Sequence, residues 1–209
     1  MKNINRIIAT VTSILLAFTM VACEKDDETA NISRVTTYAE FDMSGDQFVS
    51  LVQGETFTDP GVTALEGETE LDVTATGTVD TSTPGVYVIT YSAVNSDNFP
   101  GTITRTVAVL PEPEQEGVNI AGTYVRNGVT STVTKLAPGF YLMSNIYGSP
   151  LIAAYIITTN GTDLSLPEAT LSPYGPLFGT GTLNNGVMRL VFSLPVQGIA
   201  NRERIWERQ

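Results

Sequence analysis

The chain has 209 residues, with 11 Lys and Arg against 22 Asp and Glu, no His and a single Cys. Its formal charge of -11 argues against nucleic-acid binding, because phosphate contacts need clustered Lys and Arg. The absence of His excludes Ser-His-Asp and Cys-His catalytic groups and the usual zinc sites, which leaves carboxylate, Lys or Tyr chemistry and oxygen-ligand metals.

The first 22 residues have the order of a secretory signal. Lys2 and Arg6 precede an apolar run from Ile7 to Ala22 that is interrupted only by Thr and Ser. This run is shorter than the about 20 apolar residues of a membrane span, and no second run of that length follows. We therefore expect residues 1–22 to be removed on export.

The only cysteine, Cys23, comes next. The segment from Phe18 to Cys23 resembles the bacterial lipoprotein signal, with small Ala22 before the cysteine and Met20 where that family usually has Leu. The resemblance implies that Cys23 receives diacylglycerol and becomes the first mature residue, so that several acyl chains hold the protein to a membrane. The alternative is an ordinary cleaved signal with an incidental cysteine.

Residues 23–33 form an acidic tether that cannot fold alone, with the run Glu-Lys-Asp-Asp-Glu at 24–28. The run resembles the Lys-plus-acidic export signal of Bacteroidetes lipoproteins. That resemblance implies a lipid-anchored protein on the outer face of the outer membrane, and a periplasm-facing lipoprotein is the alternative.

Beyond the tether, helical periodicity is nearly absent, and short alternating segments rich in Val, Thr, Ile and Tyr predict an all-β chain. The first domain, residues 34–110, has a predicted core face with Ile103, Val107 and Val109, and Arg105 lies at its margin. The strands predicted in this domain are Arg34–Phe41, Gln47–Val52, Gly61–Leu65, Glu68–Ala75, Gly85–Val94 and Thr102–Leu110.

Two segments of this domain, residues 54–64 and 77–87, resemble a bacterial Ig-like surface repeat related to the hyalin-repeat sandwiches. The resemblance continues at Asn95 and ends with residues 105–109. The resemblance implies an Ig-like β-sandwich that presents another module and has no catalytic residues. Asp59, Asp80 and Asp97 fall at turns, where their side chains bond nearby backbone. Calcium ligation by these carboxylates is the alternative.

Residues 111–117 form a linker rich in Pro and Glu, which we expect to be an extended, semi-rigid spacer because its prolines stiffen it and its glutamates repel one another. Residues 118–209 form the second domain, an antiparallel β-barrel or curled sandwich with Asn-Gly hairpin turns. Its predicted strands are Gly122–Arg126, Thr130–Leu136, Gly139–Tyr147, Leu151–Thr159, Asp163–Pro167, Leu177–Leu183, Val187–Leu194 and Arg202–Arg208.

This second domain resembles the C-terminal β-domain that follows an Ig-like domain in Bacteroides surface lipoproteins, on residues 122–124, 139–141 and 205–207. That family implies no activity. The runs 151–157 and 187–192 are apolar on both faces and predict central strands that are covered on each side. A barrel lumen that takes an apolar ligand is the alternative.

Exposed aromatic rings with polar neighbours are the usual means of binding sugars, because the C–H faces of sugars stack on them. Tyr147 and Tyr174 lie in turns rich in Gly and Pro, and Arg204 and Trp206 share one face of the last strand, where cation–π stacking is expected. The alternative is that Trp206 plugs the barrel and the tyrosines pack locally. The candidate ligand-binding residues are Tyr147, Tyr174, Phe178, Arg204 and Trp206.

We expect no enzyme, no cofactor and no metal site. Glu203 and Glu207 share a face of one strand at roughly 13 Å, which is too far for a glycosidase pair unless Asp163 or Glu168 lies nearby. The expected function is non-catalytic binding of a glycan or host macromolecule by the C-terminal domain, held on the Ig-like stalk. The alternative is an accessory subunit of an outer-membrane nutrient-uptake complex, without its own ligand site.

Overall fold

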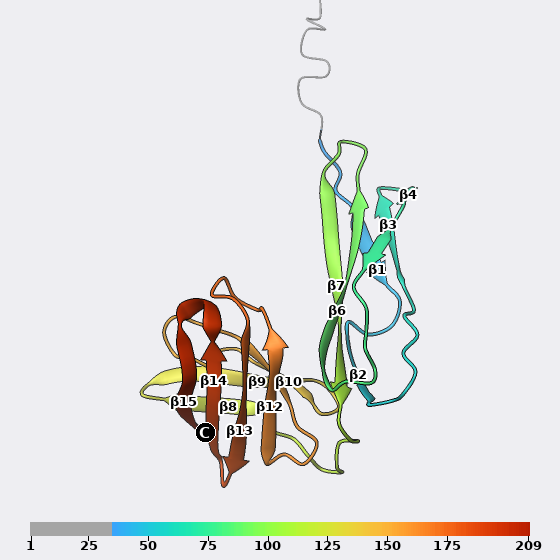
Figure 1. Cartoon of the computed structure of the whole chain (residues 1–209). Helices are drawn as coiled ribbons and strands as arrows, with labels where there is room; N and C mark the ends of the chain where they lie inside the picture. Colours follow the sequence, from blue (N-terminus) through green and yellow to red (C-terminus); the bar gives the residue numbers. More distant parts are fainter. Residues whose placement is uncertain (1–34) are drawn as a thin grey trace, which may run out of the picture. The chain divides into compact units, whose positions relative to one another are not determined.

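The computed structural model describes residues 35–209, so the predicted signal peptide, the lipidation site Cys23 and the acidic tether lie outside the described residues. The described chain is all-β, as predicted, with one short 3₁₀ helix, η3 (Pro195–Gln197), and no α-helix (Figure 1). None of its helices has the length and apolar character needed to cross a membrane.

The first domain is an Ig-like sandwich of two sheets. The long antiparallel pair β6 and β7 forms its centre (Figure 1), and β2 adds to the edge of β7 in parallel. One sheet has the order β1-β3-β4, with β1 (Glu40–Met43), β3 (Val62–Glu66) and β4 (Thr69–Leu71). The other has the order β2-β7-β6-β5, with β2 (Phe48–Val52), β7 (Pro100–Leu110), β6 (Gly85–Val94) and β5 (Thr74–Thr76).

The strand predicted over Glu68–Ala75 is two strands in the structure. β4 pairs with β3 and β5 pairs with β6, so the chain passes from one sheet to the other at Asp72 and Val73. Apolar and polar residues continue to alternate through residues 72 and 73, so the sequence pattern does not show that the chain changes sheets there. The prediction of a single strand is wrong for this reason.

Arg105 lies in the core of the sandwich and not at its margin as predicted. Its side chain is 0% exposed, and its Nε is 3.2 Å from the Asp59 carboxylate and donates to the Tyr91 hydroxyl at 3.2 Å. Its Nη groups donate to the backbone carbonyls of three residues, Ser44, Asp46 and Gly61. A buried charge with this many acceptors is compensated, which explains why a core position of β7 tolerates arginine.

The second domain is a closed antiparallel barrel whose neighbouring strands follow one another in sequence, with closure between β15 and β8 (Figure 1). Of the two predicted alternatives, the barrel is therefore the one formed. Its strands are β8 (Gly122–Arg126), β9 (Val129–Ala137), β10 (Phe140–Met143), β11 (Ala154–Ile157), β12 (Asp163–Ala169), β13 (Leu177–Asn184), β14 (Val187–Leu194) and β15 (Ile199–Arg208).

Side chains fill the barrel lumen. Trp206, Tyr124, Tyr141 and Phe192 belong to one buried cluster together with aliphatic residues from the other strands of the barrel. Eight strands leave an interior that side chains of this size occupy. The alternative of an apolar ligand in the lumen is therefore not supported.

The two apolar runs behave differently. β11 is buried on both faces: Ile156 joins the lumen cluster, and Tyr155 and Ile157 join a cluster with β7. The prediction of a doubly covered strand is confirmed for residues 154–157, but Leu151, in the same predicted run, lies before the strand and is exposed. The prediction is wrong for β14, where alternate residues such as Val187 and Arg189 are exposed on the outer face of the barrel.

The segment from residue 111 to residue 117, predicted to be an extended, semi-rigid spacer, is hydrogen-bonded to the barrel. The Glu114 carboxylate accepts hydrogen bonds from Lys135 Nζ at 2.7 Å and from the Tyr141 hydroxyl at 2.9 Å. Glu112 accepts a hydrogen bond from the Thr159 hydroxyl at 2.9 Å. These partners compensate the charges of Glu112 and Glu114, so repulsion between the glutamates does not keep the segment away from the barrel.

Candidate functional site

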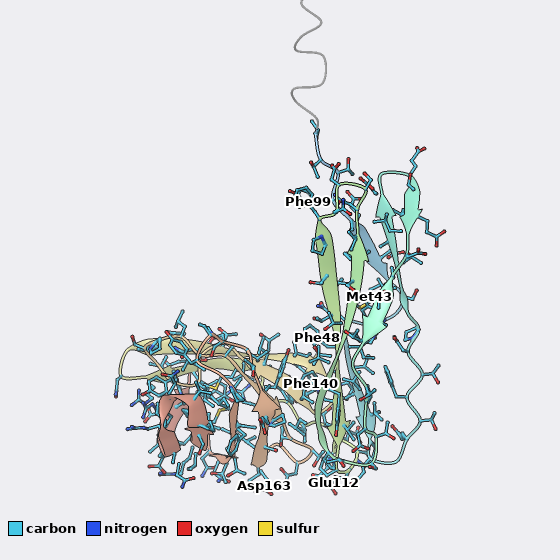
Figure 2. The ribbon with its side chains drawn as sticks, turned by 45° about the horizontal axis from the view of Figure 1, so that its top comes forward. Met43, Phe48, Phe99, Glu112, Phe140 and Asp163 are labelled. Atoms are coloured by element: carbon cyan, nitrogen blue, oxygen red, sulfur yellow. The ribbon has the colours of Figure 1, made fainter. Side chains whose placement is uncertain are left out.

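An open cleft of about 540 Å³ lies where the Ig-like sandwich, the 111–117 segment and the barrel meet. We call it the acidic cleft, because its charged lining residues are Glu112, Asp163 and Glu168. Figure 2 shows Glu112 and Asp163 on the same side of the molecule. The rest of the lining comes from the start of β6 (Pro84, Gly85, Val86 and Tyr87), from Pro111 and from the β11–β12 region (Ile157, Thr158, Thr159, Asn160, Leu164, Ser165 and Pro167).

Hydrogen bonds hold the β11–β12 turn of the acidic cleft in place. The Asn160 amide donates to the Asp163 carboxylate at 2.9 Å, and its carbonyl oxygen accepts from the Asp163 backbone N–H at 2.8 Å. The Thr158 hydroxyl accepts from the backbone N–H of Gly161 at 3.0 Å. Such local side-chain-to-backbone bonds fix a turn before any ligand arrives.

Tyr87 is the aromatic residue of this cleft. Its hydroxyl donates to the Thr83 carbonyl oxygen at 2.8 Å, which fixes the half-buried ring at the start of β6. Burial first, and then the nearby Asp80 carboxylate, raise the pKa of Tyr87, so the phenol stays neutral at ordinary pH. Tyr87 also packs against the sandwich core of Leu51, Val107 and Val109, so only the part of the residue that lines the cleft is open to a ligand.

The charge and composition of the acidic cleft restrict its ligands. All three charged side chains are carboxylates, which repel anions and accept hydrogen bonds from hydroxyl or amine groups. Between them lie apolar surfaces from Val86, Ile157 and Leu164. A cleft of this volume with mixed lining fits a neutral or cationic ligand that carries many hydrogen-bond donors.

Trp206 is not available to a ligand, which corrects its prediction as a binding residue. Its side chain is 0% exposed inside the barrel, and its Nε1 donates to the Ile146 carbonyl oxygen at 3.2 Å. The two-residue alternation placed it correctly on a face with Arg204, but that face points into the lumen. The alternative, that Trp206 plugs the barrel, describes the structure.

Arg204 and Tyr147 are brought together. The Arg204 guanidinium carbon lies 4.4 Å from the centroid of the Tyr147 ring, and its Nε donates to the Tyr147 carbonyl oxygen at 2.9 Å. The predicted stacking of arginine on Trp206 is not among the cation–π contacts of residues 35–209, and Arg204 stacks on Tyr147 instead. The Tyr147 ring also meets Phe192 edge-on at 6.3 Å, so the tyrosine is half-buried against the core.

The other two predicted residues lie apart from this pair in the described chain. Tyr174 is half-buried and packs against the barrel core, and Gln197 donates to its backbone carbonyl oxygen. Phe178 is 41% exposed on β13, opposite Ser193 of β14. None of the ring contacts in residues 35–209 joins either of them to Tyr147.

The carboxylates weighed for a glycosidase fall into two places. Asp163 and Glu168 line the acidic cleft, while Glu203 and Glu207 line a second cleft at β15. Glu203 is paired with Arg189 at 2.6 Å. Asp163 and Glu168, the partners that a glycosidase pair with Glu203 or Glu207 would need, therefore line a different cleft from these two acids.

The turn carboxylates Asp59 and Asp80 are used by the fold itself. Asp59 accepts from the backbone N–H of Gly61, and Asp80 accepts from the backbone N–H and hydroxyl of Ser82. Within residues 35–209, no group of three or more His, Cys, Asp or Glu side chains is placed to hold a metal ion.

The acidic cleft was not predicted from the sequence, where Glu112 was placed in a spacer and Asp163 and Glu168 were considered only as partners in a glycosidase pair. The residues come from three segments that are close only because the barrel packs against β6 and β7. No motif in the sequence indicates that packing.

Comparisons with known proteins identify the first domain. Residues 41–109 match the family model described as bacterial surface protein, Ig-like domain. Among solved structures, the crystal structure of a lipoprotein from Bacteroides thetaiotaomicron is similar, with 20% identity and a TM-score of 0.42 over 82% of this chain and 100% of that chain. No curated protein shows significant similarity. Residues 41–109 are thus similar to the Ig-like domain of bacterial surface proteins.

Proposed function

We propose that this protein is a lipid-anchored cell-surface protein that binds a hydroxyl-rich ligand, such as a neutral glycan, without catalysis. The acidic cleft is the observation that carries this proposal. Its volume of about 540 Å³ falls within the range of ligand sites in proteins, and its turn is held by the protein's own hydrogen bonds.

Two features support the location. The Ig-like domain is similar to those of bacterial surface proteins. The chain also begins with a signal-like segment that ends at its only cysteine, followed by an acidic tether. In this proposal, acyl chains on Cys23 hold the protein in the outer membrane, and residues 23–33 separate the folded domains from the lipid surface.

The ligand class follows from the lining of the cleft. Sugar hydroxyls donate to the carboxylates of Glu112, Asp163 and Glu168, and C–H faces pack on the Tyr87 ring. Neutral hydroxyl-rich ligands satisfy these acceptors without adding negative charge. A polyanion is disfavoured at this site because three carboxylates surround it.

A glycan array followed by isothermal titration, with residues 34–209, tests the proposal. We expect a neutral polysaccharide to bind and Tyr87→Ala to weaken the affinity roughly tenfold, since the variant removes the stacking face of the cleft. Phe178→Ala is the matched control, because it removes an exposed aromatic ring from the outer face of β13. Bound glycan should also remain intact after long incubation.

Two outcomes would contradict this function. If no polysaccharide binds, the cleft is not a glycan site. If binding survives Tyr87→Ala but is lost in Phe178→Ala, the site lies on the barrel wall instead.

The accessory role is a second candidate because of one apolar surface. Tyr38 and Phe99 are exposed, with ring centroids 5.9 Å apart, and Val94 is exposed beside them. Figure 2 shows Phe99 at the end of the β6–β7 hairpin. Exposed apolar patches mark protein contacts. Retention by an outer-membrane transporter that is lost in Phe99→Ser would favour this role over glycan binding.

A further inference from the structure

A second cleft, of about 460 Å³, lies beside β15 where β8 ends. We call it the arginine cleft, after Arg126 and Arg204 in its lining. β8 pairs with β15 only at Tyr124 and Val125, so β15 runs on past the end of β8 and the cleft opens beside it. The remaining lining residues are Val125, Asn127, Glu203, Ile205, Glu207 and Gln209.

Arg204 is held in position while part of its guanidinium stays free. Nε donates to the Tyr147 carbonyl oxygen and Nη1 donates to the Glu203 carbonyl oxygen at 3.0 Å. In residues 35–209, these two hydrogen bonds start at Nε and Nη1, and the Tyr147 side chain also contacts the guanidinium, which forms no ion pair. The side chain is therefore oriented by the fold and keeps donors for a ligand.

The loop that orients Arg204 is itself rigidly bonded. Asn145 is buried, and its carbonyl oxygen accepts from the backbone N–H groups of Tyr147 and Gly148 at 3.2 and 2.9 Å. Its amide donates to the Gly148 carbonyl oxygen at 2.9 Å. A binding residue fixed by such supporting contacts loses little freedom when it meets a ligand.

Arg126 approaches the same loop from β8. A Cβ placed on Gly148 would lie 3.3 Å from Arg126 Nη1, so the guanidinium lies directly against this glycine. No hydrogen bond or ion pair in the described chain occupies Arg126. Burial, followed by repulsion from Arg126 and then from Arg202, lowers the pKa of Arg204, which shows how closely these positive charges are grouped.

The two acids in the lining do not neutralise this group. Glu203 is paired with Arg189 at 2.6 Å on the outer face of the barrel. Glu207 shares that face by the two-residue alternation of β15, whereas Arg204 lies on the other face with Trp206. The positive charges of Arg126 and Arg204 are thus left without a carboxylate partner among the described residues.

We propose that Arg126 and Arg204 form a binding site for an oxyanion, a carboxylate or sulfate group, either on a saccharide or as a free ion. Guanidinium groups present paired N–H donors that match the planar oxygens of carboxylate and the oxygens of sulfate. The site is separate from the acidic cleft, which repels such groups. A ligand with acidic sugars would bind here and a neutral one would not.

The test uses the full chain purified in a non-ionic detergent, titrated at low ionic strength with four probes. These are an oligogalacturonate, its fully methyl-esterified form, a sulfated oligosaccharide and sodium sulfate. We expect the oligogalacturonate or the sulfated oligosaccharide to bind and the ester to bind at least tenfold more weakly, since esterification replaces each carboxylate with a neutral methyl ester. Affinity should fall as salt is raised.

Arg126→Gln is the principal variant, because Arg126 makes no hydrogen bond that the fold needs. We expect it to weaken binding roughly tenfold while the melting temperature stays unchanged. Glu207→Gln should strengthen binding or leave it unchanged, and Tyr87→Ala should leave it unchanged. Binding of sulfate alone, lost in Arg126→Gln, would support the site with a free ion as its ligand.

Three outcomes would overturn the proposal. These are equal binding of the acid and its ester, unchanged affinity in a folded Arg126→Gln protein, and failure of all charged probes to bind at low salt. Failure of the neutral glycan in the acidic cleft has no bearing on these measurements, so the two proposals stand or fall separately.

Discussion

At the scale of single residues, the buried Arg105 makes contacts that connect the two sheets of the Ig-like domain. The guanidinium joins β7 to the Asp59 turn, to Tyr91 of β6 and to carbonyl oxygens of the segment before β2. Through these contacts a single side chain ties the two sheets of the Ig-like domain together. No buried side-chain polar atom within residues 35–209 lacks a hydrogen-bond partner.

Replacing Arg105 with Met should be strongly destabilising. The substitution removes the cation beside the Asp59 carboxylate and the donor to the Tyr91 hydroxyl and to backbone carbonyl oxygens, and we expect the free energy of unfolding to fall by about 3 kcal/mol or more. Urea denaturation measures this loss. Arg189→Met is the matched control: its pair with Glu203 is about half exposed (51% and 49%), so the loss there should stay below about 1 kcal/mol. Equal losses of unfolding free energy in Arg105→Met and Arg189→Met would show that the buried contacts of Arg105 stabilise the fold no more than a surface ion pair does.

At the scale of elements, the 111–117 segment is part of the fold. Its contacts with β9 and β10 converge on Glu114. Burial alone raises the pKa of Glu114, but hydrogen bonds from Lys135, the Gly139 backbone and Tyr141 outweigh it and hold the pKa below its usual value. The ionised carboxylate is therefore the form that the folded protein favours.

The contribution of Glu114 to the stability of the fold therefore depends on pH. Because the folded-state pKa of Glu114 is depressed, its stabilisation is fully present above the unfolded-state pKa of about 4.3 and is lost as pH falls through the folded-state value. We expect Glu114→Gln to lower stability at neutral pH and to flatten the loss of stability below about pH 4.3. Urea midpoints measured across this pH range test it. Glu116→Gln, at an exposed position, should keep the parent profile, and a parent-like profile for Glu114→Gln would refute the assignment.

At the scale of the whole molecule, the sandwich and the barrel share a buried apolar contact. Phe140 of β10 is fully buried and packs against Phe48 of β2, with ring centroids 6.3 Å apart, and against Tyr155 at 5.0 Å (Figure 2). Gly139 makes the approach close: its φ is 65°, and a Cβ there would lie 2.9 Å from Leu110. The two domains should therefore unfold together.

Phe48→Ala tests this coupling, because it removes the sandwich side of the contact and leaves the barrel lumen intact. We expect the single calorimetric transition of the parent to broaden or split into two, with the less stable domain melting earlier. Phe99→Ala, at an exposed position, is the control and should melt as the parent does. A single sharp transition in Phe48→Ala would mean that this contact does not link the domains.

The proposed anchor is also a property of the whole molecule. Cys23→Ser should move the protein from the membrane fraction to the soluble fraction, because it removes the thiol that lipidation requires. The variant should still fold, since the compact unit begins at Thr37. Membrane fractionation together with circular dichroism measures both effects. A variant that stays in the membrane would contradict the lipid anchor, and one that fails to fold would contradict a folded unit that is independent of Cys23.

The sequence by itself determined the fold class and many of the strands. The bounds of β6, β8 and β14 were predicted to the residue, because alternating runs flanked by Gly, Pro or Asn carry the two-residue period in the local sequence. The Ig-like family of residues 41–109 was also recognisable from its motifs. Strand bounds and family motifs could be predicted because they depend on residues that are close together in the sequence.

Tertiary structure alone decided which face of each strand meets solvent and which segments meet one another. It buried Trp206 and Arg105, bound Glu114 to Lys135, and brought Tyr87 to the same cleft as Asp163. A period of two separates the faces of a strand but does not say which face is covered, or by what. Both clefts, and with them both binding proposals, arise from packing between segments far apart in the chain.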